Sequence, residues 1–157
     1  MNVVFGDYTL GVHAKDASYI FSYAKGGLES LSKNGTEWIS KPVRPLFWRA
    51  TTCNDRGNGF SYKSSVWMGA DLFTESSGIS VSVDGHGFRQ DEIIAPANNK
   101  LIDSHYRNAK SVTIIFEYRV SFSDAARTVI SYTVTESGMR TDYYYHGDES
   151  LPSVPAL

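Results

Sequence analysis

The strongest constraint on the fold is an alternation of apolar and polar side chains in residues 111–122, SVTIIFEYRVSF. A period of two is typical of a half-buried β-strand, because successive side chains of a strand point to opposite faces. The face expected to be buried carries Val112, Ile114, Phe116, Tyr118, Val120 and Phe122. Residues 128–137, TVISYTVTES, repeat the pattern, and GMRTDYYYHG follows at 138–147. We therefore predict three long antiparallel strands in this half of the chain.

Shorter strands are expected nearer the N-terminus, at residues 19–23, 28–32 and 37–39. They are separated by the dipeptides Gly26-Gly27 and Asn34-Gly35, which both favour tight hairpin turns. Asn34-Gly35-Thr36 also matches a glycosylation acceptor, but the hairpin turn explains it better. These segments predict a meander of antiparallel strands.

The remaining segments complete an all-β prediction. GISVSVDG at 78–85 adds a strand, and SSVWMGADLF at 64–73 suggests only a helical turn. Residues 89–110 are expected to form a long connection. Strands with glycine-rich turns in a chain of 157 residues favour a single domain, residues 1–157, folded as an antiparallel β-sandwich.

Composition excludes several classes of partner. The 15 basic and 17 acidic residues nearly balance and form no basic stripe, so no nucleic acid is expected. No apolar run approaches the roughly 18 residues of a membrane span, and the N-terminus does not resemble a signal peptide, so no membrane association is expected. The single cysteine, Cys53, cannot support a disulfide framework, which favours a reducing, cytoplasmic location.

The segment FWRATTCNDRGNGF, residues 47–60, places large aromatic residues and an arginine before a run of turn-forming residues. We expect a strand that runs into an ordered loop, where Asn and Gly tolerate a positive φ. Such a segment could be an active site, a ligand-binding loop or a structural corner. Its composition favours the corner, in which Arg49 reaches a carboxylate or backbone carbonyls through its planar fork.

The same segment carries a family resemblance. Together with the preceding hairpin (residues 28–50) and the following SSVWMGADLF, it resembles the C-terminal β-sandwich module, or small chain, of glycoside hydrolase family 2 β-galactosidases. That family typically reads Phe-Trp-Arg-Ala-Pro, then Thr-Asp-Asn-Asp-Arg-Gly, then Trp-Lys. The matching residues are Phe47, Trp48, Arg49, Ala50, Asn54, Asp55, Arg56 and Gly57. Thr51 stands in place of the proline, Cys53 in place of the first acid, and Met68 in place of the lysine.

The resemblance implies a supersandwich of the galactose-mutarotase type, of which this chain looks like the front part. It also implies that the catalytic glutamates lie elsewhere, on a (β/α)₈ barrel that needs on the order of 200 residues or more. A retaining glycosidase requires two carboxyl groups about 5 Å apart. The candidate acids of this chain are expected in loops without such pairing: Asp55, Asp71, Glu75, Asp91 and Glu92. The chain should therefore be inactive alone.

Two groups of residues receive roles from the resemblance. The loop Trp67, Met68, Gly69, Ala70 and Asp71 is expected at the rim of the substrate site, where it gates or selects the substrate, with an ordinary surface turn as the alternative. The structural motif comprises Phe47, Trp48, Arg49, Asn54, Asp55, Arg56 and Gly57. Within this motif, Arg49, Asp55 and Arg56 are expected to form a polar network where the sandwich meets the barrel.

Partners and cofactors follow from the same resemblance. The expected partner is the catalytic barrel domain or large subunit of a parent β-galactosidase, so galactosides such as lactose are contacted only indirectly. The family commonly uses Mg and Na or K ions, but no residue here is assigned as a ligand. The pairs Asp84-x-His86 and Asp103-x-His105 arise easily by chance. Unpaired strand edges are expected to cause self-association of the isolated chain.

A second function remains open at this stage. An aromatic content of 13% and the sandwich class give weak support to a free-standing carbohydrate-binding module. Such a module would bind sugar directly through residues such as Tyr144 or Trp67, because aromatic rings pack against the apolar faces of sugars.

Overall fold

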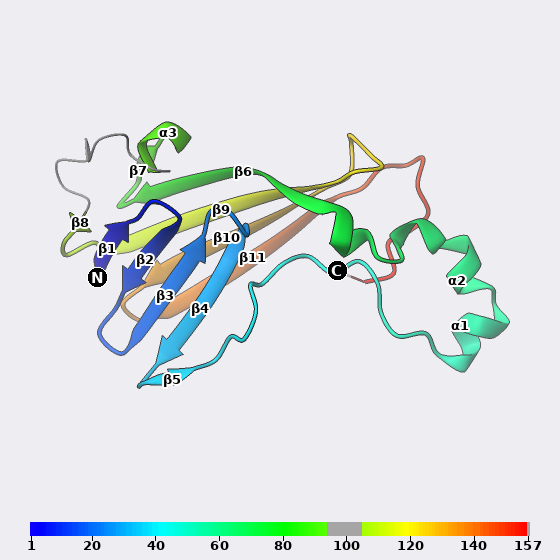
Figure 1. Ribbon diagram of the computed structural model, residues 1–157, viewed down its shortest axis with the longest axis horizontal. Coiled ribbons are helices and arrows are strands. Elements are labelled where there is room, and N and C mark those ends of the chain that lie inside the picture. Colours follow the sequence, from blue (N-terminus) through cyan, green and yellow to red (C-terminus); the bar gives the residue numbers. More distant parts are fainter. Residues whose placement is uncertain (94–104, 157) are drawn as a thin grey trace.

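The computed structural model describes residues 1–93 and 105–156, with only the backbone described for Gln90, Asp91, His105 and Tyr106. Two antiparallel sheets pack face to face, and a group of short helices lies beyond one end of them (Figure 1). The prediction of an all-β antiparallel sandwich is confirmed.

The first sheet has six strands in the order β5-β4-β3-β2-β1-β8. Their bounds are β1 Asn2–Phe5, β2 Thr9–His13, β3 Ala17–Ser22, β4 Gly27–Lys33, β5 Thr36–Glu37 and β8 His105–Tyr106. Consecutive hairpins join β1 to β5, so the predicted meander is confirmed. The turn between β4 and β5 has positive φ at both Asn34 (52°) and Gly35 (77°), as a type I′ hairpin turn requires.

The second sheet has five strands in the order β11-β10-β9-β6-β7. Their bounds are β6 Thr74–Val83, β7 His86–Phe88, β9 Ser111–Val120, β10 Arg127–Thr135 and β11 Gly138–His146. The three long strands predicted from alternation are therefore present. The strand predicted at 78–85 begins earlier, at Thr74, and its pairing with β9 shifts register between Ser76 and Gly78.

Five short helical segments complete the described chain: α1 Cys53–Gly57, α2 Phe60–Lys63, η1 Ser65–Trp67, η2 Ala70–Phe73 and α3 Gln90–Ile93. The helical turn expected at 64–73 is thus a pair of 3₁₀ turns. No helix within residues 1–93 and 105–156 is both long and apolar enough to cross a membrane.

The main core lies between the sheets and contains the predicted alternating residues. Ile114, Phe116 and Tyr118 of β9 are fully buried, and Phe21 of β3 packs against Tyr132 of β10 with ring centroids 5.3 Å apart. Burial of each large apolar side chain contributes about 1.5–3 kcal/mol. Phe122 lies beyond the end of β9 and is 36% exposed, so the buried row ends at Val120.

Gly26 and Gly27 allow a close crossing of three chain segments. The Tyr118 hydroxyl donates to the carbonyl of Gly26 at 2.8 Å, and the Val43 amide donates to the carbonyl of Leu28 at 2.9 Å. A Cβ atom on Gly27 would lie 2.3 Å from the carbonyl oxygen of Val43. Only glycine therefore allows residues 41–44 to pass along the start of β4.

Several expectations were wrong or incomplete. The strand expected at 37–39 ends at Glu37, because its carboxylate accepts the amides of Trp38 and Ile39 at 3.1 Å and 3.0 Å and turns the chain. Strands β1 and β2 were not expected at all. Residues 89–110 are not only a connection, since α3 and β8 lie within them; residues 94–104 lie outside the described part of the chain.

Candidate functional site

Residues 47–73, which we call the helical lobe, bring the predicted structural motif and the predicted rim loop together. The lobe extends beyond the end of the sheets, and residues 147–156 return to it (Figure 1). A second buried cluster forms there, distinct from the core between the sheets: Phe47, Trp67, Ala70, Val120 and Ala126. Both predicted groups thus contribute to one small core.

Trp67 is the centre of this cluster. Its side chain is completely buried and stacks on Phe47 with ring centroids 5.6 Å apart and an interplanar angle of 26°. The indole Nε1 donates to the carbonyl oxygen of Pro152 at 2.7 Å. The rings of Phe122 and Tyr145 stand nearly perpendicular to the indole, with centroids 5.3 Å and 6.4 Å away. One residue therefore joins the rim loop, the motif and the C-terminal segment.

The backbone after Phe47 differs from the predicted strand and loop. Residues 47–52 are not a strand, and Cys53–Gly57 form α1. The reason is a capping box: the Thr52 hydroxyl accepts the Asp55 amide at 3.2 Å, and the Asp55 carboxylate accepts the Thr52 amide at 2.7 Å. This arrangement satisfies two amides that a helix N-terminus otherwise leaves free. The local sequence signal for this helix start is Thr52-x-x-Asp55, and the predicted structural motif does not include Thr52.

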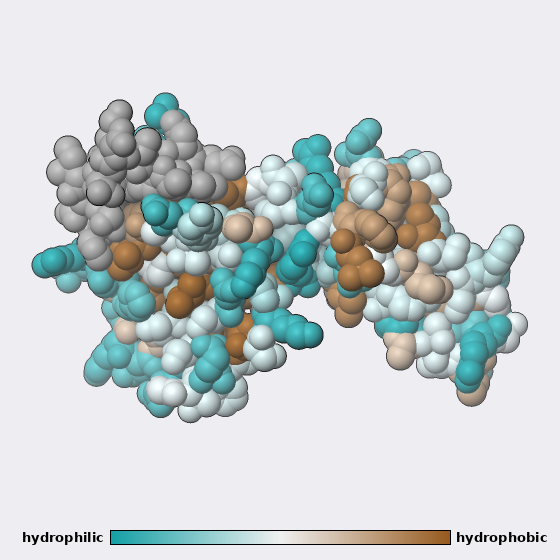
Figure 2. Space-filling view, in the orientation of Figure 1, coloured by the Kyte–Doolittle hydropathy of each residue, from teal (hydrophilic) through white to brown (hydrophobic). Residues whose placement is uncertain are grey.

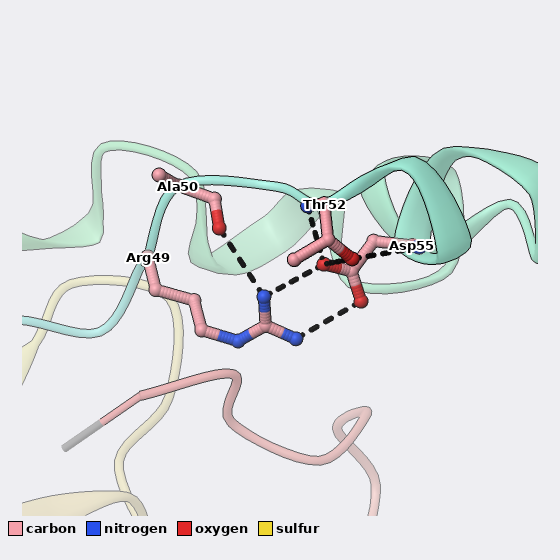
Figure 3. A network of polar contacts seen from close by, with 4 residues as sticks. All are labelled: Arg49, Ala50, Thr52 and Asp55. Carbon is pink, nitrogen blue, oxygen red and sulfur yellow. Dashed lines mark hydrogen bonds and ion pairs between the residues drawn. The ribbon is translucent and has the colours of Figure 1, made fainter.

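Arg49 and Asp55 form the predicted ion pair in a two-pronged geometry (Figure 3). Arg49 Nη1 lies 2.7 Å from Asp55 Oδ2, and Nη2 lies 3.0 Å from Oδ1. Nη1 also donates to the carbonyl of Ala50 at 3.2 Å. The Arg49 guanidinium lies 4.9 Å from the ring centroid of Phe60, within the range of a cation–π interaction.

The hydrogen bonds to Arg49, followed by those to Thr52, lower the pKa of Asp55 well below its ordinary value. A carboxylate held in the charged form cannot act as a general acid near neutral pH, where a raised pKa is needed. The geometry of Asp55 therefore fits a structural role and not that of a general acid.

The rest of the motif only partly matches the expected network. The Arg56 side chain forms no hydrogen bond or ion pair with Asp55; its Nη2 donates to Cys53 Sγ at 3.2 Å. Asn54 contributes its backbone carbonyl, which accepts the backbone amide of Asn58 at 2.9 Å at the end of α1. Gly57 has an ordinary φ, and in residues 53–59 the left-handed conformation occurs at Gly59. Trp48 is half-buried and packs against Phe60 with centroids 5.3 Å apart.

The rim loop is anchored at two points and exposed between them. Trp67 and Ala70 are buried, whereas Met68 is 56% exposed. Gly69 separates the two 3₁₀ turns with φ 76°, a conformation that favours glycine. The buried Thr74 hydroxyl donates to the carbonyl of Ala70 at 2.7 Å and closes η2. The loop is therefore a short projecting bend on a fixed base.

The other candidate acids do not lie in loops as expected. Asp71 belongs to η2 and Glu75 to β6, while Asp91 and Glu92 belong to α3. The Glu92 carboxylate accepts the amide of Arg89 at 2.7 Å, and the side chain of Asp91 lies outside the described residues. These positions and contacts do not show the pair of facing carboxyl groups that hydrolysis of a glycoside requires.

Within the described residues, no group of three or more His, Cys, Asp and Glu side chains could hold a metal ion. Asp84 is instead used for structure, since its Oδ1 accepts the amides of Lys110 and Ser111 at 2.8 Å. The pair Asp103-x-His105 lies outside the described side chains. Trp67, named as a sugar-binding residue under the alternative function, is buried and cannot present its ring to a sugar, whereas Tyr144 is 55% exposed.

Comparison with known proteins identifies this combination of motif, loop and sandwich. The chain is 43% identical over 156 residues to a β-galactosidase small subunit from Latilactobacillus sakei, covering 99% of this chain and 48% of that protein. It is 34% identical over 160 residues to a β-galactosidase from Halalkalibacterium halodurans, covering 99% of this chain and 13% of that protein. A Clostridium acetobutylicum β-galactosidase is 30% identical over 158 residues, covering 15% of its length.

The chain therefore spans about half of the small subunit that it matches and a smaller part of the longer β-galactosidases. The profile of the family described as β-galactosidase small chain matches residues 13–156, nearly the whole sequence. The chain belongs to the β-galactosidase small chain family.

Proposed function

We propose that this chain is a single, non-catalytic β-sandwich domain of a β-galactosidase, which packs against the catalytic barrel or large subunit and shapes the rim of its active site. The observation that carries the proposal is the stacking of Trp67 on Phe47. This contact fixes the rim loop to the motif while Met68 projects from the surface. A projecting bend on a rigid base is suited to shaping a neighbouring site.

The side chains of this domain support a non-catalytic role. Asp55 is neutralised by Arg49, and the described residues offer no three-ligand cluster for the ions that the family resemblance implies. The proposal therefore assigns hydrolysis of β-galactosides such as lactose, and any Mg, Na or K site, to the rest of the parent enzyme. The exposed thiol of Cys53 supports a reducing cytoplasm for the parent.

The first test is hydrolysis of a chromogenic β-galactoside by the purified chain, alone and after mixing with its large subunit. Activity is expected only in the mixture. Hydrolysis by the chain alone would overturn the proposal and return attention to Asp71 and Glu75.

The role of the loop is tested by Gly69→Pro and Gly69→Ala in the assembled enzyme. Both residues disfavour φ 76°, so the bend should shift and the kcat of the assembled enzyme should change. Gly85→Ala is the matched control, because Gly85 has φ 83° with nothing within 4 Å of an added Cβ and lies in the β6–β7 turn. Unchanged turnover in both Gly69 variants would argue against a role at the rim.

Strand β11 supports the further proposal that the isolated chain self-associates. It is a nine-residue edge of the five-stranded sheet, with Tyr143 38% and Tyr144 55% exposed. A long exposed edge is a template for pairing with another strand. Sedimentation should show association that rises with concentration and falls in Tyr144→Lys. A monomer at all concentrations would contradict this.

A further inference from the structure

An open cleft of about 800 Å³ lies between the β3–β4 turn, residues 41–44 and the start of β6. Its lining includes Lys25, Lys41, Arg44, Leu72, Thr74 and Glu75. Three of these side chains are cationic and one is acidic, although the chain has a net charge of −2. The cleft is thus a positively charged site on a slightly acidic protein.

Within the described residues, two of the three cations have no ion-pair partner. Lys25 pairs with Glu29, whereas no carboxylate of the described residues forms a salt bridge with Lys41 or Arg44. Arg44 is held in place by donating from Nη2 to the carbonyl of Thr74. The cleft therefore presents positioned positive charge that an external carboxylate could neutralise.

Exposed apolar side chains adjoin the charged wall. Leu72 lines the cleft and is 78% exposed, and Phe73 and Met68 of the same segment are 63% and 56% exposed. Figure 2 shows apolar residues gathered where β6 begins and where the C-terminal segment lies. Exposed apolar side chains that cluster beside polar ones mark protein interaction surfaces, whereas a small free anion gains nothing from them.

We propose that this cleft, together with Met68, Leu72 and Phe73, docks a segment of the large subunit that carries a carboxylate beside apolar side chains. The inference rests on the proposed function, because it names the surface by which the domain packs on its partner. Charge complementarity selects an acidic segment, and the apolar residues select a polypeptide. The docked segment lies next to the rim loop, since Met68 belongs to both surfaces.

The test measures the affinity of the chain for its large subunit by calorimetry at low and high ionic strength. Lys41→Gln with Arg44→Gln is compared with Lys33→Gln with Arg127→Gln, which removes the same charges from surfaces outside the cleft. The cleft variant is expected to weaken binding about tenfold or more at low salt and to bind with a smaller salt dependence. The control should stay within about twofold of the unmodified chain.

The apolar part of the surface is tested with Leu72→Ser against Tyr8→Ser, since Tyr8 is 74% exposed and does not line the cleft. Only Leu72→Ser should weaken binding. Zero-length coupling of amines to carboxylates, followed by mass spectrometry, should join Lys41 to an Asp or Glu of the large subunit.

The outcomes separate the two proposals. No binding of the unmodified chain to the large subunit overturns the proposed function and the inference together. Normal binding with equal effects of cleft and control variants overturns the inference alone. If the cleft variant instead loses only the binding of inorganic phosphate, the cleft is a small-anion site and the docking proposal is wrong.

Discussion

The core between the sheets and the core of the helical lobe differ in size and in the kind of contacts that stabilise them. In the described residues, the main core contains nineteen buried side chains, and the lobe cluster contains five. The main core spreads its contacts over alternating rows on many strands. The lobe instead depends on one buried indole, Trp67, with an ion pair and a cation–π contact around it. Stability is therefore distributed in the sheets and concentrated in the lobe.

The largest expected effect is on the main core. Phe116→Ala should lower the free energy of unfolding by about 3–5 kcal/mol, because Phe116 is fully buried between the sheets. Denaturant unfolding followed by far-UV circular dichroism measures the change. Ile115→Ala is the control on the opposite face of β9, where the side chain is half-buried, and should cost less. An equal cost at both positions would show that the two faces of β9 are equally buried.

Trp67→Ala tests whether the lobe opens independently of the sheets. Loss of the indole removes the Phe47 stack and leaves the Pro152 carbonyl without its donor, so the free energy of local opening should fall by about 3 kcal/mol. Hydrogen exchange should show faster exchange in residues 53–67 with β9 still protected. Trp48→Ala, at a half-buried position, should have a smaller effect. Simultaneous loss of protection in β9 would mean that the two cores unfold as one.

Gly27→Ala should affect the junction between the two regions. The substitution places a Cβ 2.3 Å from the carbonyl oxygen of Val43 at a residue with φ 150°, so we expect a loss of about 2 kcal/mol in the free energy of unfolding. Gly35→Ala, with φ 77° and nothing within 4 Å, isolates the cost of backbone strain, about 1 kcal/mol. Equal losses in the two variants would show that the crossing tolerates displacement.

The smallest expected effect concerns the Arg49–Asp55 pair, because the Arg49 side chain is 43% exposed and exposed ion pairs contribute little. Arg49 lowers the pKa of Asp55 in the folded chain, so the contribution of the pair is present at neutral pH. This contribution is lost progressively as the pH falls from about 4, the ordinary pKa of an aspartate in an unfolded chain, to the lower pKa of Asp55 in the folded chain. The Tm difference between the unmodified chain and Asp55→Asn should therefore shrink on acidification. A difference that stays constant with pH would argue against the pair.

The other member of the pair, Arg49, offers a test of assembly. Arg49→Ala should lower the Tm and weaken binding to the large subunit, because the fork to Asp55 fixes the chain before α1. Unchanged Tm and unchanged binding would show that the motif is not structural.

The sheets were largely predictable from sequence because a period of two reports directly which side chains are buried. Val112, Ile114 and Tyr132 occupy the predicted face. The missed strands β1 and β2 are short, although Val3, Phe5, Leu10 and Val12 alternate in the same way and are buried. Four or five residues give too few repeats for the pattern to stand out.

The lobe was less predictable because its contacts join residues far apart in the sequence. The resemblance selected Trp67 and Phe47, but nothing local to either residue indicated that their rings stack. The hydrogen bond from Trp67 to Pro152 spans 85 residues and has no signature in composition or period. Helix α1 was predictable in principle from Thr52-x-x-Asp55, which is a local signal.

The bond between Trp67 and Pro152 also sets the order in which the molecule can assemble. The hairpins of β1 to β5 join neighbouring segments, so they can form while the chain is still being synthesised. Trp67 has no acceptor until residue 152 has left the ribosome. The lobe that carries residues 67–71 is therefore completed only after β9, β10 and β11 have been synthesised.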